Sequence, residues 1–140
     1  MIEGALALAG TLANTRHVQI VRHFQPGLPT APLDRHQIQQ LVINLCTNAM
    51  DAMPKGGTLT VDISGNADAL ELKVTDTGTG IRPELREQIF EPFYTTKEVG
   101  KGTGLGLALV AEIVKKHNAV LDLKTEIGVG TTFSIRFPTH

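Results

Sequence analysis

Four glycines at every second position, Gly100, Gly102, Gly104 and Gly106, lead directly into a helical pattern. Glycine is unfavourable at a helix entrance, because it loses more backbone entropy on folding than any other residue. A helix N-terminus with bare N–H groups can, however, hold an anion, above all a phosphate. The spacing matches neither the P-loop nor the GxGxxG pattern. The segment alone therefore indicates either phosphate binding or a loop that feeds an amphipathic helix.

An aspartate stands at the end of a predicted strand, in the segment DTGTG from Asp76 to Gly80. A carboxylate in this place can accept a hydrogen bond from the edge of a flat ligand. Gly78 and Gly80 allow the backbone to turn sharply beside it. The same segment is also compatible with an ordinary aspartate-glycine turn.

Two asparagines four residues apart, Asn44 and Asn48, lie one above the other on the polar face of a predicted helix. Asparagine has poor helix propensity, and charged residues would serve better on a face that is only solvated. The pair therefore indicates ligand binding. A carboxamide oxygen suits Mg²⁺, which takes one or two protein oxygens together with water and substrate phosphates.

Periodicity predicts the elements that must position these residues. Helices are expected within the first sixteen residues, from Asp34 to about Met53 before Pro54, and from Thr103 to His117. A helical turn is expected near 84–89, in the loop-rich stretch 77–102. Strands are expected at 17–24, 58–64, 69–76, 120–125 and 132–137. This alternation predicts an α/β layer, a mixed sheet with helices on one face.

Composition limits the class of protein. A chain of 140 residues with a net charge of −1 is expected to form one soluble globular domain with a real core. Its Lys and Arg residues are scattered among acids, which argues against a general nucleic-acid or membrane surface. Cys46 is the only cysteine, so an internal disulfide and a cysteine metal cluster are excluded. We expect Cys46 to be a small core residue.

Four segments together resemble the ATP-binding domains of sensor histidine kinases, which belong to the GHKL superfamily. NLCTNAMDAM, DTGTGI, FEPFYTTK and GKGTGLGLALV follow the order and spacing of the N, G1, F and G2 boxes. The sequences of these segments are most similar to those of the nitrogen-regulatory type of sensor kinase. The resemblance covers nearly the whole chain and implies a single catalytic domain over residues 1–140. Its implied fold is the Bergerat fold, an α+β two-layer sandwich with a mixed, mostly antiparallel sheet of about five strands, helices on one face and a mobile ATP lid.

The resemblance also implies roles for single residues. Asn48 matches the magnesium ligand, Asp76 matches the carboxylate that accepts from the adenine amino group, and Thr131 matches a threonine that orders water beside that carboxylate. Asn44, Asn48 and Lys97 are the catalytic candidates. The residues that the resemblance places around the nucleotide are Asn48, Asp51, Asp76, Gly78, Gly80, Ile81, Phe90, Phe93, Lys97, Gly100, Lys101, Gly102, Thr103, Gly104, Leu105, Gly106, Leu107 and Thr131.

The implied activity is that of a protein histidine kinase. Such a domain binds ATP with Mg²⁺ in the cytoplasm and transfers the γ-phosphate to a histidine on its own kinase's dimerisation hairpin, so a response regulator is an indirect partner. Related ATPases carry a glutamate where Asn44 stands, and an amide cannot take a proton from water. A neutral imidazole needs no such base, because its lone pair is already nucleophilic. The alternatives are a catalytically silent ATP-dependent binding module and a GHKL ATPase.

Two departures from the family pattern stand out. None of the five histidines begins a helix of the phosphoacceptor kind, so the hairpin is expected to be a separate part and the isolated domain a monomer. His17 and His23 fall in a predicted strand and are interpreted as structural. The helix from Thr103 is followed by Asn118 where the family commonly has glycine, and asparagine can adopt the same left-handed cap. We expect this change to have little effect.

Overall fold

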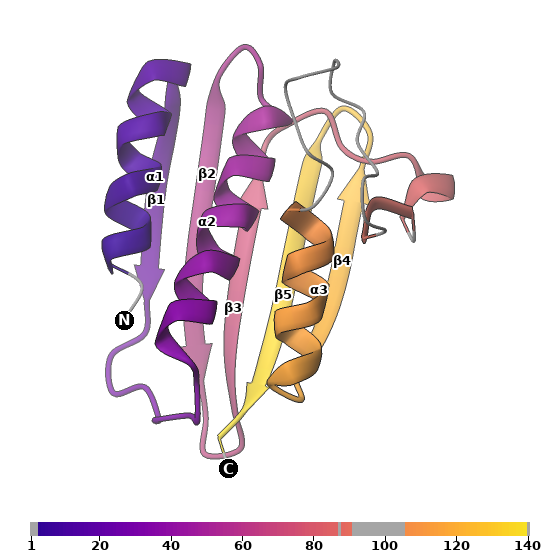
Figure 1. The fold of residues 1–140 in the computed structure, drawn as a ribbon. Helices are drawn as coiled ribbons and strands as arrows, with labels where there is room; N and C mark the ends of the chain where they lie inside the picture. Colours follow the sequence, from indigo (N-terminus) through magenta and orange to yellow (C-terminus); the bar gives the residue numbers. More distant parts are fainter. Residues whose placement is uncertain (1–2, 87, 91–105, 140) are drawn as a thin grey trace.

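The computed structural model describes residues 3–86, 88–90 and 106–139 (Figure 1). Its α-helices are α1 (Glu3–Arg16), α2 (Arg35–Asp51) and α3 (Gly106–Lys116). Its strands are β1 (Val18–Phe24), β2 (Gly57–Gly65), β3 (Ala69–Asp76), β4 (Val120–Glu126) and β5 (Gly130–Pro138). The expected helical turn is present as two 3₁₀ turns, η1 (Pro83–Leu85) and η2 (Gln88–Phe90).

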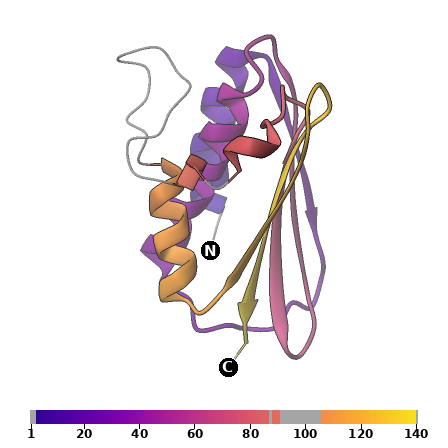
Figure 2. The ribbon, with the colours of Figure 1, turned by 90° about the vertical axis from the view of Figure 1, so that its right-hand side faces the viewer.

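The five strands form one sheet in the order β1-β2-β3-β5-β4. Only β1 and β2 run parallel, and the other three pairs are antiparallel. Figure 2 shows α1, α2 and α3 on one face of the sheet, and no helix of the described residues lies on the opposite face. The predicted two-layer sandwich with a mixed, mostly antiparallel sheet is therefore confirmed.

The core lies between the helices and the inward face of the sheet. Alternating residues of the central strands are buried there, among them Leu59, Val74 and Phe133. Cys46 has no exposed surface and belongs to this core, as expected. The buried residues of α2 are Ile38, Leu41, Val42, Leu45, Cys46, Ala49 and Met50. This apolar stripe leaves the opposite face of α2 to its polar residues.

The helix ends follow the capping signals in the sequence. Asp34 caps α2, and its Oδ1 accepts a hydrogen bond of 2.9 Å from the backbone N–H of Gln37. After α3, Asn118 has a φ of 53°, in the left-handed region. The next N–H, of Ala119, donates to the Val114 carbonyl at 3.0 Å. Asparagine therefore closes α3 as expected.

The prediction that His17 belongs to a strand is wrong. His17 lies between α1 and β1 with a φ of 59°, a left-handed conformation that reverses the chain at the end of α1. Its carbonyl accepts a hydrogen bond of 3.3 Å from the N–H of Gly57 at the start of β2. His23 does lie in β1, and its Nδ1 is 3.0 Å from Oδ1 of Asp62 on the neighbouring strand.

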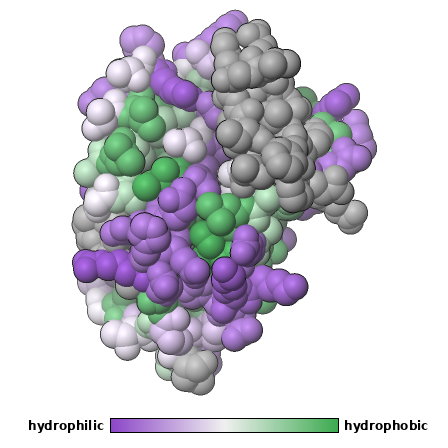
Figure 3. Space-filling view, in the orientation of Figure 1, coloured by the Kyte–Doolittle hydropathy of each residue, from purple (hydrophilic) through white to green (hydrophobic). Residues whose placement is uncertain are grey.

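The surface of the helical face is mixed. Figure 3 shows a hydrophilic band there with separate hydrophobic areas beside it. Leu8 of α1 is half exposed, whereas the neighbouring Leu6 is fully buried. No helix in the described part of the chain is long and apolar enough to cross a membrane.

Candidate active site

Asp76 is a buried carboxylate at the end of β3, with only 4% of its surface exposed. Its Oδ1 accepts a hydrogen bond of 2.8 Å from the N–H of Gly78, and the Thr131 N–H also donates to the carboxylate. Burial raises the pKa of Asp76, while these two N–H groups act in the opposite direction. Such a group suits the predicted role, which is to accept a hydrogen bond from a ligand amino group.

The loop after Asp76 is clamped between α2 and the β4–β5 hairpin. The N–H of Thr79 donates to the Ala52 carbonyl at 3.0 Å, and the Thr79 carbonyl accepts from Gly128 at 3.0 Å. A Cβ on Gly78 would collide with the Ala52 carbonyl oxygen. Gly80 has a φ of 80°, and a Cβ there would lie 2.5 Å from the carbonyl oxygen of Glu126. The glycines of this loop therefore allow close packing on both sides.

Thr125 is a residue of the site that sequence reasoning missed. Its hydroxyl accepts a hydrogen bond of 2.8 Å from the N–H of Ile81 and lies 2.9 Å from the hydroxyl of buried Thr131. Thr125 and Thr131 lie opposite each other in the β4–β5 hairpin. This pairing of two threonines was the signal in the sequence that could have indicated the contact. Thr131 in turn pairs with Asp76. Ile81 thus joins the site through its backbone.

The polar face of α2 meets the first turn of α3. Asn44 Nδ2 donates to the carbonyl of Gly106 at 3.3 Å, and its Oδ1 accepts from Gln40 at 3.1 Å. Asn48 is half-buried, and its side chain makes no hydrogen bond to another described residue. A Cβ on Gly106 would meet no described atom within 4 Å. Asn44 therefore links the two helices, while the Asn48 amide is available to a ligand.

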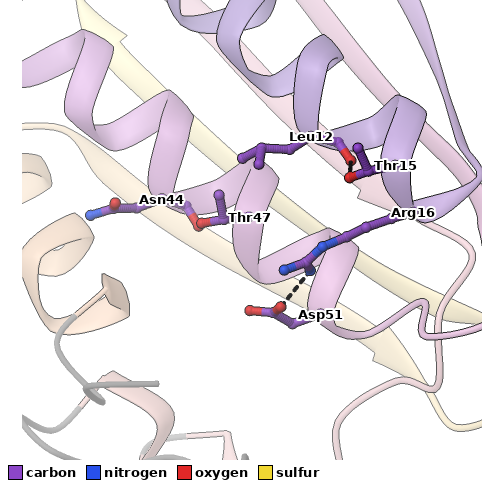
Figure 4. A network of polar contacts seen from close by, with 6 residues as sticks. All are labelled: Leu12, Thr15, Arg16, Asn44, Thr47 and Asp51. Carbon is purple, nitrogen blue, oxygen red and sulfur yellow. Dashed lines mark hydrogen bonds and ion pairs between the residues drawn. The ribbon is translucent and has the colours of Figure 1, made fainter. Parts of the chain in front are cut away.

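Asp51, a predicted nucleotide contact, forms an ion pair with α1. The Arg16 guanidinium lies 2.6 Å from Asp51 Oδ1, and 45% and 24% of the two side chains are exposed. Figure 4 shows the Arg16 head reaching from α1 to the end of α2, with Asn44 and Asp51 leaving α2 toward the same side. Arg16 was not among the predicted site residues.

Two further predicted residues pack beside the site. The ring of Phe90 meets that of Phe133 edge to face, with centroids 6.3 Å apart. Leu107, in the first turn of α3, is half-buried against the core. The remaining predicted residues lie outside the described part of the chain: Phe93, Lys97, Gly100, Lys101, Gly102, Thr103, Gly104 and Leu105.

The described residues contain no cluster of three or more His, Cys, Asp or Glu side chains that could hold a metal ion. A magnesium site here would therefore need few protein ligands. The Asn48 carboxamide fits that requirement, because Mg²⁺ commonly takes one or two protein oxygens and completes its shell with water and phosphate oxygens.

A family model described as "Histidine kinase-, DNA gyrase B-, and HSP90-like ATPase" matches residues 33–140. The chain belongs to this family. The match begins just before α2 and includes Asn44, Asn48, Asp76 and Thr131, so the residues brought together above lie within it.

The curated relatives that the chain resembles include sensor kinases and histidine kinases. The sensor kinase CckA of Brucella abortus is 44% identical over 120 residues, which is 75% of this chain and 13% of the relative. The histidine protein kinase DivJ of Caulobacter vibrioides is 35% identical over 98% of the chain and 24% of its own length. The sensor histidine kinase ZraS of Escherichia coli K12 is 34% identical over all of the chain and 30% of its own length. The chain thus spans less than a third of these relatives.

Solved structures of histidine kinases have the same fold. A nucleotide-free catalytic domain of the histidine kinase ThkA superposes with a TM-score of 0.85 at 27% identity, covering 99% of this chain and 91% of that one. Full-length ShkA in complex with AMPPNP superposes with a TM-score of 0.82 at 28% identity, covering 100% of this chain and 31% of that one. Family and fold together identify the chain as a catalytic, ATP-binding domain of the histidine kinase type.

Proposed function

We propose that this chain binds ATP with Mg²⁺ and donates the γ-phosphate to a histidine on the dimerisation hairpin of its own kinase. One observation carries the proposal: buried Asp76 lies beside the end of α2, and Asn44 of the same helix contacts the first turn of α3. The polar face of α2 therefore connects two groups that suit a nucleotide. One is a carboxylate that can accept from an amino group, and the other is a helix N-terminus that can hold phosphates.

ATP would lie along this face. Asp76 would accept from the adenine amino group, and the first N–H groups of α3 would face the phosphates. Asn48 would hold Mg²⁺ through its carboxamide oxygen, and the bound ion would offset phosphate charge. The domain would have to position the γ-phosphate and exclude water, which is most of what phosphoryl transfer requires of a protein.

The acceptor would be a neutral imidazole. Its nitrogen lone pair forms the N–P bond while the bond between the γ-phosphorus and the β,γ-bridging oxygen breaks, so that ADP leaves with that electron pair. The proton on the other ring nitrogen passes to water. No protein base is needed for the attack, since the lone pair is available at neutral pH.

Asn44 favours transfer to histidine over hydrolysis of ATP. Its amide oxygen accepts from Gln40, its N–H donates to Gly106, and an amide takes up no proton near neutral pH. Asn44 therefore cannot act as the base that activates water. Its role here is to link α2 to the helix entrance that would face the phosphates.

We also propose the setting in which the domain acts. Residues 1–140 would function as one catalytic domain, because α1 packs against α2 and buries Leu6 and Ala9 in the shared core. The isolated domain would be a monomer in the cytoplasm, where ATP is abundant. Its partner would be the phosphoacceptor hairpin, and a response regulator would receive the phosphate from that hairpin.

Labelled ATP tests the proposal. With Mg²⁺ and γ-labelled ATP, the chain alone should gain no acid-labile phosphate, whereas a separately made hairpin from its own kinase should be labelled in its presence. Labelling should be slow, because a bimolecular encounter replaces the high effective concentration of a tethered hairpin. A hairpin without its histidine is the control. Rapid labelling of the chain on one of its own histidines would contradict the proposal, and a hairpin unlabelled at any concentration would favour a silent binding module.

A further inference from the structure

The carboxylate of Asp51 stands where a negative charge is unfavourable. It lies in the last turn of α2, which carries no basic residue, so it adds to the negative end of the helix dipole. A carboxylate in that position does not stabilise its own helix. A nearby cation would offset this unfavourable effect.

Asp51 also shares a helix face with the site. It follows Asn44 by seven residues and Asn48 by three, and these spacings place the three side chains on one side of α2. Figure 4 shows Asn44 and Asp51 pointing to the same side. The next residue, Ala52, contacts the loop that follows Asp76. A triphosphate that extends from Asp76 toward the start of α3 would approach this carboxylate, and the two negative charges would repel each other.

The Arg16 guanidinium offsets this charge. It lies 2.6 Å from Asp51 Oδ1, and it is the basic residue in the last turn of α1, where a cation is favourable. One positive charge thus faces the C-terminal ends of two helices and the carboxylate between them. Arg16 also lies outside residues 33–140, so the family match does not include it.

We propose that Arg16 is a positioning residue that acts through Asp51, and that it cancels the Asp51 charge so that a nucleoside triphosphate can bind beside α2. This inference rests on the proposed function. Arg16 holds the Asp51 carboxylate against the end of α2 and removes the repulsion that this carboxylate would exert on the phosphates. Its effect should therefore grow with the number of phosphates on the ligand.

The test is a charge series measured by calorimetry with ATP, ADP and adenosine in the presence of Mg²⁺. Arg16→Gln should weaken ATP binding by about five- to tenfold, the size expected when a few phosphate charges lose one nearby cation in a solvated site. The affinity of this variant for ADP should fall by a smaller factor, and its affinity for adenosine should fall by less than about twofold. Arg16→Lys should keep most of the ATP affinity, because the positive charge remains. Added salt should reduce the difference in ATP affinity between wild type and Arg16→Gln.

The double variant Arg16→Gln with Asp51→Asn decides how Arg16 acts. Removing the carboxylate as well should recover most of the ATP affinity that Arg16→Gln alone loses. Arg136→Gln is the matched control, because Arg136 also pairs with a carboxylate, 3.7 Å from Glu71, but on β5 rather than at the end of α2. This control should bind all three ligands as wild type does.

Each outcome decides between the inference and the proposed function. A wild-type chain that does not bind ATP would contradict the proposed function. If wild type binds ATP and Arg16→Gln binds it equally well, the inference alone is wrong. Equal losses for ATP and adenosine would show a purely structural role for Arg16 and would overturn the inference. Failure of the double variant to recover would contradict an action of Arg16 through Asp51.

Discussion

The carboxylate of Asp76 is buried among backbone N–H groups that hold its orientation, so its ligand specificity should depend on what it can accept. An adenine amino group donates to it, whereas guanine would present a carbonyl to the same oxygen. We expect the chain to prefer ATP over GTP, and Asp76→Ala to weaken ATP binding by about 1.5–3 kcal/mol, the value of a hydrogen bond to a charged group. Calorimetry with both nucleotides measures this. Equal affinity of wild type for ATP and GTP would remove Asp76 from its role.

The raised pKa of Asp76 predicts a dependence on pH. As the pH falls through this pKa, the carboxyl takes up a proton and accepts less well, so ATP affinity should begin to fall above the pH at which an ordinary aspartate titrates. The ligand-free protein should behave oppositely. Because the folded form binds the Asp76 proton more tightly, the contribution of Asp76 to the unfolding free energy should be fully present below its unfolded pKa and should be lost as the pH rises through its folded pKa.

Binding and unfolding should both be measured against pH in wild type and in Asp76→Asn, which has no titrating carboxyl. The difference between the two proteins isolates Asp76 from the other acids. Identical pH profiles for the two proteins would show that Asp76 does not titrate in this range and would contradict the predicted dependence.

Single residues differ in how far the sequence alone identifies them. Asp76 could be found because a carboxylate between a strand and glycines has few ordinary uses, and Asn48 because asparagine is a poor choice for a solvated helix face. Thr125 and Arg16 could not be found in this way. Their partners Ile81 and Asp51 are 44 and 35 residues away along the chain, and no local pattern predicts contacts over such separations. The one local signal was the position of Thr125 opposite Thr131 in the β4–β5 hairpin.

The contact between the loop after β3 and the end of α2 should require a residue without a side chain at position 78. Gly78→Ala places a methyl group against the Ala52 carbonyl, so we expect a loss of about 1–3 kcal/mol in unfolding free energy from overpacking, together with weaker ATP binding. Gly10→Ala in α1 is the control. Its Cβ meets no described atom within 4 Å, and it should be neutral or stabilise the helix by about 0.5–1 kcal/mol. A Gly78→Ala protein as stable as wild type would contradict this packing.

The β4–β5 hairpin should support the site through one hydroxyl. Thr125→Val leaves the N–H of Ile81 and the hydroxyl of Thr131 without their shared partner, so we expect a loss of about 1–3 kcal/mol in unfolding free energy. Thr132→Val is the matched control, because its hydroxyl bonds only to Thr75 at 3.1 Å. Denaturant unfolding of both variants measures the difference. Equal losses would show that the Thr125 hydroxyl has no special role.

The elements themselves were largely predictable, whereas their order in the sheet was not. Alternating apolar residues identified β2 and β3, and Asp34 identified the start of α2, because these signals are local. The pairing of β3 with β5 joins Asp76 to Thr131 across 55 residues of chain, and it depends on the burial of whole faces. The error at His17 also involves a distant part of the chain, since the carbonyl of this left-handed residue accepts a hydrogen bond from Gly57 of β2.

At the scale of the whole molecule, the N-terminal helix packs against the helix that carries Asn44 and Asn48. The family match begins at residue 33, yet α1 packs on α2 and contributes Leu6 to the same core. Its last turn also carries Arg16, which pairs with the end of α2. A change in the position of α1 would therefore reach Asp51 directly. This contact gives α1 a physical route by which it can influence the phosphate side of the site.

Cys46 provides a probe of the whole fold. Its side chain is fully buried, and burial raises the pKa of its thiol to about 12, so the reactive thiolate is almost absent from the folded protein. We expect thiol reagents to modify Cys46 of the native protein only through its unfolded population, and to modify the denatured protein rapidly. By the proposed function, ATP with Mg²⁺ would bind the folded form alone. When labelling is slower than refolding, ATP should then divide the labelling rate by about one plus the ratio of the free ATP concentration to its dissociation constant. Rapid labelling of the native chain, or a rate that ATP at saturating concentration leaves unchanged, would contradict this coupling between the core and the nucleotide site.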